Sequence, residues 1–219
     1  MRQFWSTVKL YKRLSMSEKR LYEYNNNNNG KRYHFYMHDQ VDWDSELFEQ
    51  MTTMREASSD DIVHIHINGH GGSVSVGAQY IAAMRSSKAT IVTYNEGLAA
   101  SMFALIFLAG DYTVPCEHSS LMLHEMRVGM GATASSDVLR TVAHMQKGFR
   151  SLYDSVVKDF TTEEEDERIF STGFDHYFEY EEQMTRLGVQ ATVPEDEEDT
   201  IEPFIITVDI AKCLTDSPE

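Results

Sequence analysis

The distribution of apolar residues divides the chain into alternating strand-like and helix-like segments. Apolar and polar residues alternate over residues 61–67 (DIVHIHI), and segments at residues 33–37, 90–94 and 118–124 also predict strands. Helical spacing predicts helices over residues 44–55, 73–85, 100–108 and 137–160. Strands that alternate with helices predict a layered α/β domain built on a parallel sheet.

The longest predicted helix, residues 137–160, carries a continuous apolar stripe. Its members follow one another at steps of three or four residues: Val138, Val142, Met145, Phe149, Leu152, Val156 and Phe160. The helix either projects from the body and packs on a partner or belongs to the core of its own domain. Periodicity alone does not choose between the two.

The two ends of the chain differ in charge from the middle. Residues 1–32 are basic and end in an Asn-rich linker, residues 33–190 hold the predicted domain, and residues 191–219 form an acidic extension. The 20 acidic and 4 basic side chains of residues 151–219 account for the whole net charge of −16. Within the extension, residues 203–210 form an apolar run that could add an edge strand or dock on a neighbour.

The composition disfavours several classes of function. An acidic chain is repelled by phosphate backbones, so we expect no nucleic acid among its partners. No apolar run reaches the length of a membrane span, and residues 1–15 lack the apolar stretch of a signal peptide, so we expect a cytoplasmic protein without a membrane partner. The two cysteines, Cys116 and Cys213, form no CxxC motif, so we expect neither a disulfide scaffold nor a metal site.

Two turns that follow predicted strands contain glycine. In residues 68–74 (NGHGGSV), Gly71 and Gly72 let backbone N–H groups approach a ligand, which suits a developing oxyanion. The spacing of a nucleotide-binding loop is absent. In residues 96–102 (EGLAASM), Ser101 lies at the start of an apolar helix, where it is either a nucleophile or an N-cap. His124 ends a predicted strand and is either a general base or a buried structural histidine.

Taken together and in this order, these segments resemble the proteolytic subunit of Clp protease (ClpP). That family has a glycine-pair turn, a GxAASM segment, a MIHQP-like segment and a long "handle" helix, and here they read NGHGGSV, GLAASMFALIFLAG, LMLHEM and GMGATASSDV. The resemblance spans roughly residues 33–189. It implies a ClpP/crotonase-like layered fold with a protruding handle helix.

By matching positions, the resemblance implies that Ser101 is the nucleophile, His124 its general base, and Gly71 and Met102 the donors of an oxyanion hole. The stretch around Asp175 resembles the family's RD-x-F…EEA…GL segment and implies that Asp175 orients the histidine. Counting back from Gly188 without a gap puts His176 at that place instead, and Asp166 and Asp159 are weaker candidates.

The sequence departs from the family beside both turns. His70 replaces a proline, and Glu125 with Met126 replaces a Gln-Pro pair after the base. We expect strand geometry to continue to His124, so that the Glu125 side chain points to the opposite face and has little effect on the base. If the strand has already ended, the carboxylate could lie close enough to stabilise the imidazolium. These departures indicate a divergent member of the family, and one expected origin of such a member is a phage genome.

The implied function is a serine endopeptidase without a cofactor. Members of the family form heptameric rings that stack in pairs into a tetradecamer, and they usually receive unfolded protein from a Clp-type ATPase. Three alternatives stay open: a phage head-maturation protease of the same clan, a non-catalytic ring subunit, and a crotonase-like acyl-CoA enzyme.

Overall fold

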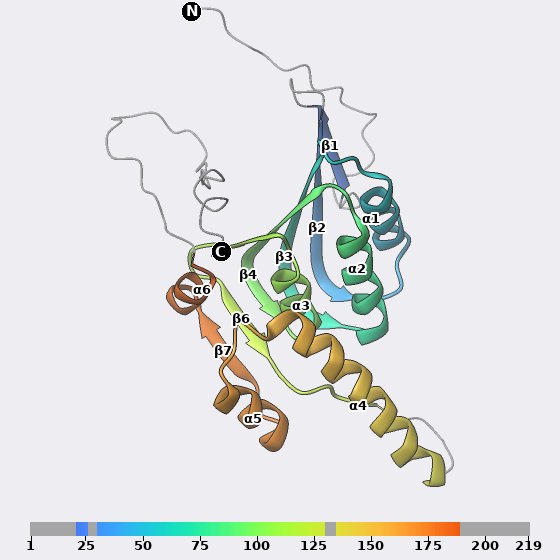
Figure 1. The fold of residues 1–219 in the computed structure, drawn as a ribbon, viewed down its shortest axis with the longest axis vertical. Helices are drawn as coiled ribbons and strands as arrows, with labels where there is room; N and C mark the ends of the chain where they lie inside the picture. The colour runs from blue at the N-terminus through green and yellow to red at the C-terminus, as the bar shows by residue number, and fades with distance from the viewer. Residues whose placement is uncertain (1–20, 26–29, 130–134, 189–219) are drawn as a thin grey trace, which may run out of the picture.

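One sheet of seven strands organises the chain in the computed structural model, which describes residues 21–25, 30–129 and 135–188 (Figure 1). The strands are β1 (Leu21–Asn25), β2 (Lys31–Val41), β3 (Ile62–Gly72), β4 (Thr90–Ala100), β5 (Tyr112–Pro115), β6 (Ser120–Leu123) and β7 (His176–Glu179). The helices are α1 (Ser45–Glu56), α2 (Val74–Ser86), α3 (Met102–Leu108), α4 (Ser135–Val157), α5 (Glu163–Thr172) and α6 (Tyr180–Leu187).

The sheet is parallel in its middle and antiparallel at both edges. Its order is β1-β2-β3-β4-β6-β7, and β5 pairs with the early part of β4. The pairs β2–β3, β3–β4, β4–β5 and β4–β6 are parallel, whereas β1 and β7 add antiparallel edges. The predicted layered α/β fold with a parallel sheet is therefore confirmed.

Alternation along the strands decides which face of the sheet becomes the core. In β3, Val63, Ile65 and Ile67 are fully buried, and the residues between them point to the other face. Helices α1 and α2 lie beside one another, and α3 packs on β3 and β4, so these helices cover the apolar face (Figure 1). The N-caps match the sequence signals, since the Asp44 carboxylate accepts from Glu46 N at 2.8 Å and the Ser73 hydroxyl accepts from Val76 N.

Several elements differ from their predicted bounds. Strands β3 and β4 continue through the glycine-bearing turns to Gly72 and Ala100, because extended backbone persists up to the starts of α2 and α3. Strand β6 ends at Leu123, one residue before His124. Strand β1 lies within the basic segment of residues 1–32, where no strand was predicted. Strands β5 and β7 and helices α5 and α6 were not predicted, and the apolar run 203–210 lies outside the described residues.

The long helix α4 divides into two halves, so neither sequence interpretation of its stripe holds along the whole length. Phe149, Tyr153 and Val157 are buried in the core of the chain, and Phe149 lies beside Phe170 of α5. Toward the N-terminus of the helix, Leu139 is 79% exposed and Met145 is 43% exposed. Figure 1 shows this first half extending away from the sheet, as a handle would. No helix among the described residues has the length and apolar character needed to cross a bilayer.

Histidine and tyrosine rings form a stacked layer on the sheet face opposite the helices. His34 stacks on His64 with centroids 4.5 Å apart, and His66 lies between Tyr36 and Tyr94 at 4.5 and 4.9 Å. The rings are also joined by hydrogen bonds: His34 Nδ1 to His66 Nε2 at 3.0 Å, and His64 Nδ1 to the Tyr94 hydroxyl at 3.0 Å. Glu96 extends this series of hydrogen bonds, because its Oε1 lies 2.6 Å from His66 Nδ1.

This layer keeps two histidines neutral at ordinary pH. Burial, followed by the nearby charges of His66 and Arg32, lowers the pKa of His34 to about 4. Burial and the neighbouring His34 lower the pKa of His64 to about 3. A histidine of the unfolded chain titrates near pH 6.5, so below that pH the unfolded state binds protons that these rings do not. Acid therefore favours unfolding.

We expect the free energy of unfolding to fall as the pH drops below about 6.5, and the fall to continue toward about pH 4 for His34 and about pH 3 for His64. His64→Phe keeps a ring in the stack but removes one titrating group, so its loss between about pH 7 and pH 5 should be smaller. Urea denaturation at each pH measures this. His118→Asn is the control, since the His118 side chain is 89% exposed. Parallel curves for wild type and His64→Phe would contradict the assignment.

Candidate active site

The backbone of Gly71, at the end of β3, lies against the turn that ends β4. A Cβ atom placed on Gly71 would lie 2.6 Å from Ala100 O, 2.7 Å from Met102 N and 2.7 Å from Ser101 Cβ. Gly71 also has a φ of +93°, a conformation that side-chain-bearing residues rarely adopt. Both facts require glycine here. They bring together three of the residues that the sequence assigns to catalysis: Gly71, Ser101 and Met102.

Ser101 has a backbone conformation that is unfavourable for serine, with φ 57° and ψ −120°. Its N–H donates to Met122 O at 2.8 Å, which ties the turn to β6. Ser101 occupies the N-cap position of α3, but its hydroxyl accepts no capping hydrogen bond. The hydroxyl is therefore not used as a cap. Strain of this kind costs about 1–3 kcal/mol and is concentrated at functional sites.

His124 lies directly after β6 and beside the Ser101 turn. In the parallel β4–β6 pair, Ala100 is opposite Met122, so Ser101 and His124 extend from neighbouring strand ends. His124 Nδ1 lies 2.5 Å from the carbonyl oxygen of Glu125. A carbonyl only accepts, so Nδ1 carries the proton and Nε2 is left as the basic nitrogen. The structure describes both Ser101 and His124 and has no hydrogen bond between their side chains. Hydrogen bonds between a nucleophile and its base are often long when no substrate is bound.

The Glu125 side chain is directed toward α4. Its Oε1 accepts a hydrogen bond from Gln146 Nε2 at 2.6 Å. From the sequence, this carboxylate is expected to point away from His124 because strand geometry continues to that residue. In the structure the strand has already ended at Leu123, and Gln146 engages the carboxylate instead.

Asp175 directly precedes β7, the strand that pairs with β6. Strand β7 pairs antiparallel with β6, and the last pair joins Leu123 to His176, so His124 and Asp175 are the residues just beyond the paired region. The carboxylate of Asp175 forms an ion pair with the guanidinium of Arg127, three residues beyond His124. The structure therefore brings Asp175 to the edge of the site but engages its charge with Arg127.

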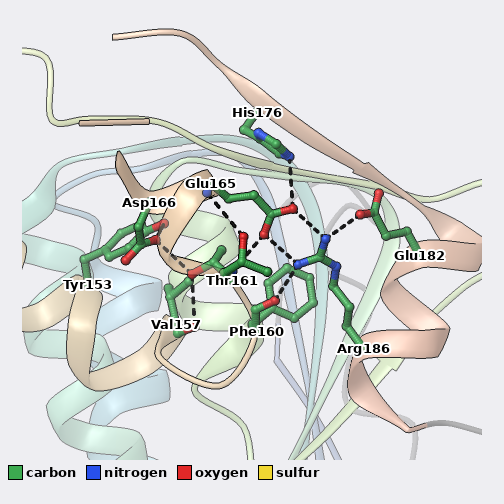
Figure 2. Close-up of polar contacts among 10 residues, drawn as sticks. Tyr153, Val157, Phe160, Thr161, Glu165, Asp166, His176, Glu182 and Arg186 are labelled. Atoms are coloured by element: carbon green, nitrogen blue, oxygen red, sulfur yellow. Dashed lines mark hydrogen bonds and ion pairs between the residues drawn. The ribbon is translucent and has the colours of Figure 1, made fainter. Parts of the chain in front are cut away.

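The alternative candidates for the third residue have other partners (Figure 2). Asp166 accepts hydrogen bonds from Thr161 Oγ1 at 2.8 Å, Arg150 at 3.0 Å and the Tyr153 hydroxyl at 3.1 Å. His176 lies opposite Leu123, and its Nε2 is 3.8 Å from Glu165 Oε1. Asp159 is exposed after the end of α4.

An ion-pair network that the sequence analysis missed fixes the segment carrying Asp175. Arg186 of α6 donates to both oxygens of Glu165 of α5, at 2.8 and 2.6 Å, and also to Glu182 (Figure 2). The hydrogen bonds from Arg186 hold the pKa of Glu165 down to about 2. Because α5 and α6 flank β7, this network holds both ends of the strand that follows Asp175. The sequence signal that could have revealed α5 is the capping box Thr162–Glu165, which is typical of a helix start.

No group of three or more His, Cys, Asp or Glu side chains within the described ranges is arranged to hold a metal ion. The donors available to the site are instead backbone N–H groups, the Ser101 hydroxyl and the His124 ring. This combination suits acyl transfer, in which a negatively charged oxygen develops beside the nucleophile.

Comparison with known proteins identifies the family. The family model for Clp protease matches residues 18–187, which is most of the chain. The chain belongs to the Clp protease family. The match includes Gly71, Ser101, His124 and Asp175 and also takes in β1, so it begins upstream of residue 33.

Individual members of the Clp protease family match over shorter stretches. The ATP-dependent Clp protease proteolytic subunit 2 of Rhodococcus jostii is 33% identical over 102 residues, covering 44% of this chain and 51% of the relative. The proteolytic subunit 3 of a Synechococcus strain, CC9605, is 32% identical over 126 residues, covering 55% and 63%. The chain thus spans about half to two thirds of the length of these curated relatives. A phage origin stays a prediction.

We expect Gly71→Ala to destabilise the fold by about 1–3 kcal/mol or more, because the added Cβ meets backbone atoms and the left-handed φ disfavours alanine. Gly129→Ala is the matched control, since nothing lies within 4 Å of a Cβ there. It should change stability by no more than about 0.5 kcal/mol. Urea denaturation of the two variants decides the matter. Equal stability would show that the contact between Gly71 and the Ser101 turn is loose.

Proposed function

We propose that the chain is a serine endopeptidase of the Clp type. One observation carries the proposal: the Gly71 backbone meets a strained Ser101 and the N–H of Met102 beside His124, at the carboxyl ends of β3, β4 and β6. Parallel sheets commonly bind ligands at this edge. Membership of the Clp protease family gives the same reaction class.

In the proposed mechanism the Ser101 hydroxyl attacks the scissile carbonyl carbon while His124 Nε2 accepts its proton. The N–H groups of Gly71 and Met102 stabilise the oxyanion of the tetrahedral intermediate. His124 then donates the proton to the leaving amine, which yields an acyl-enzyme and the first peptide product. Water, deprotonated by His124, hydrolyses the acyl-enzyme and restores Ser101. Asp175 stabilises the imidazolium that forms in both steps, and no cofactor takes part.

A non-catalytic ring subunit is the competing function. Its support is that the Asp175 carboxylate is engaged with Arg127 and the His124 Nδ1–H with a carbonyl, so the three side chains are not joined in one chain of hydrogen bonds. Against it stand the strain at Ser101 and the absence of a cap hydrogen bond from its hydroxyl. Evolution of a merely structural turn would favour glycine at such a φ.

The proposed assembly is a heptameric ring that stacks in pairs through α4, with protein or peptide substrates entering the enclosed chamber. The exposed Leu139 and Met145 on the projecting half of α4 support the stacking, because apolar side chains on a projecting helix favour a partner surface. A Clp-type ATPase as partner and a cytoplasmic location rest on the family alone. The phage head-maturation and acyl-CoA alternatives have no further support in the structure.

Ser101→Ala should lower peptide hydrolysis on the order of 10⁴-fold and abolish labelling by a fluorophosphonate, because the nucleophile is lost. Native mass spectrometry of wild type and variant, each with and without the phosphonate, reports the modification and the assembly together. The assembly should be unchanged. Activity within about tenfold of wild type would exclude Ser101 as nucleophile, and unlabelled wild type would favour the non-catalytic subunit.

Leu139→Glu and Met145→Glu should halve the mass of the assembly and leave a folded smaller ring, because a charge at each position opposes stacking. Phe149→Glu is the contrasting variant. Phe149 is only 7% exposed, so its replacement should unfold the chain rather than separate rings. Native mass spectrometry and circular dichroism distinguish these results. An unchanged mass for both handle variants would show that this half of α4 makes no ring contact.

A further inference from the structure

Two acceptors are placed to receive the Nδ1–H of His124. The Glu125 carbonyl oxygen holds it in the structure, at 2.5 Å. The second is the carboxylate of Asp175, because Asp175 and His124 are the two residues just beyond the last β6–β7 pair, Leu123–His176. That carboxylate instead forms an ion pair with Arg127, which belongs to the same segment after β6 as His124 does. Arg127 and His124 thus compete for one carboxylate.

We propose that Arg127 is a positioning residue that restrains Asp175 and keeps the His124–Asp175 pair unformed in a fraction of the molecules. The inference rests on the proposed peptidase function. The competition is one-for-one: when the carboxylate turns to His124, the guanidinium loses its partner and faces solvent. The fraction of molecules with Asp175 on His124 then sets the apparent turnover, because only those molecules stabilise the imidazolium fully.

The restraint is weak enough to be reversible. The Arg127 side chain is 68% exposed and that of Asp175 is 31% exposed. Exposed ion pairs shift equilibria by only a few fold, since water screens the charges. The Asp175 carboxylate can therefore turn to His124 at a small cost in free energy. Its attraction to the His124 ring is strongest when that ring becomes positively charged during the reaction. Arg127 therefore lowers the resting activity by a modest factor rather than blocking the site.

The competition can be measured in the full-length chain with a small peptide ester and with the rate of fluorophosphonate labelling. Arg127→Gln should raise kcat and the labelling rate about two- to fivefold with KM unchanged, because it frees Asp175 without touching the substrate. Arg127→Lys keeps a positive charge for Asp175 and should raise kcat less. Arg55→Gln, an exposed arginine of α1, is the matched control for loss of a surface charge and should equal wild type.

Asp175→Asn should lower kcat at least about tenfold, because the imidazolium then lacks its carboxylate. A fall or no change in kcat for Arg127→Gln would overturn the proposal, as would an Asp175→Asn variant as active as wild type. If wild type is labelled at Ser101 and Arg127→Gln is labelled at the same rate, the peptidase function stands and the restraint fails. If no variant is labelled, both fail together.

Discussion

The close backbone approach between Gly71 and the Ser101–Met102 turn is the constraint on which the site depends. It is possible only because residue 71 has no side chain and takes a φ of +93°. Gly72 makes a second close backbone contact, with β2, where an added Cβ would lie 2.3 Å from Val41 O. With both contacts made, β2, β3 and β4 end in a shared layer, and helices α2 and α3 start from it. The two N–H donors proposed for the oxyanion are thereby fixed by the fold.

Packing beneath the turn keeps this geometry rigid. Helix α3 is apolar on every side, and Phe103, Ile106 and Phe107 are fully buried between the sheet and neighbouring helices. Met102 extends its side chain onto α2, where an added Cβ on Gly77 would lie 2.2 Å from Met102 Cγ. A side chain on Gly77 would push Met102, and with it the Met102 N–H, out of place. Such preorganised donors need no rearrangement when charge develops.

The central strands and turns of this fold could be predicted from the sequence because the signals for them are local. Alternation along residues 61–67 marks β3, and the glycine pair and the small residues before Ser101 mark the turns. The edge of the sheet was missed because β7 has four residues and gains its place from pairing with β6. The same pairing places His176 in β7 opposite Leu123, whereas Asp175 precedes the strand, and counting along the chain does not show this difference. For α4, periodicity shows an apolar stripe but not that Phe149 is buried beside Phe170 while Leu139 is exposed.

The site therefore combines two kinds of order. The proposed oxyanion donors and the Ser101 turn belong to the backbone, and the close approach at Gly71 fixes their positions. The proposed relay from Ser101 through His124 to Asp175 depends on side chains, and weaker forces hold them: the His124 ring donates to a carbonyl, and the Asp175 carboxylate pairs with an exposed arginine. Steric contacts among backbone atoms change only if the fold does, whereas a partly exposed ion pair exchanges partners at little cost. Differences in activity between states of this protein should thus arise on the His124 side of the site, while the Gly71 side stays the same.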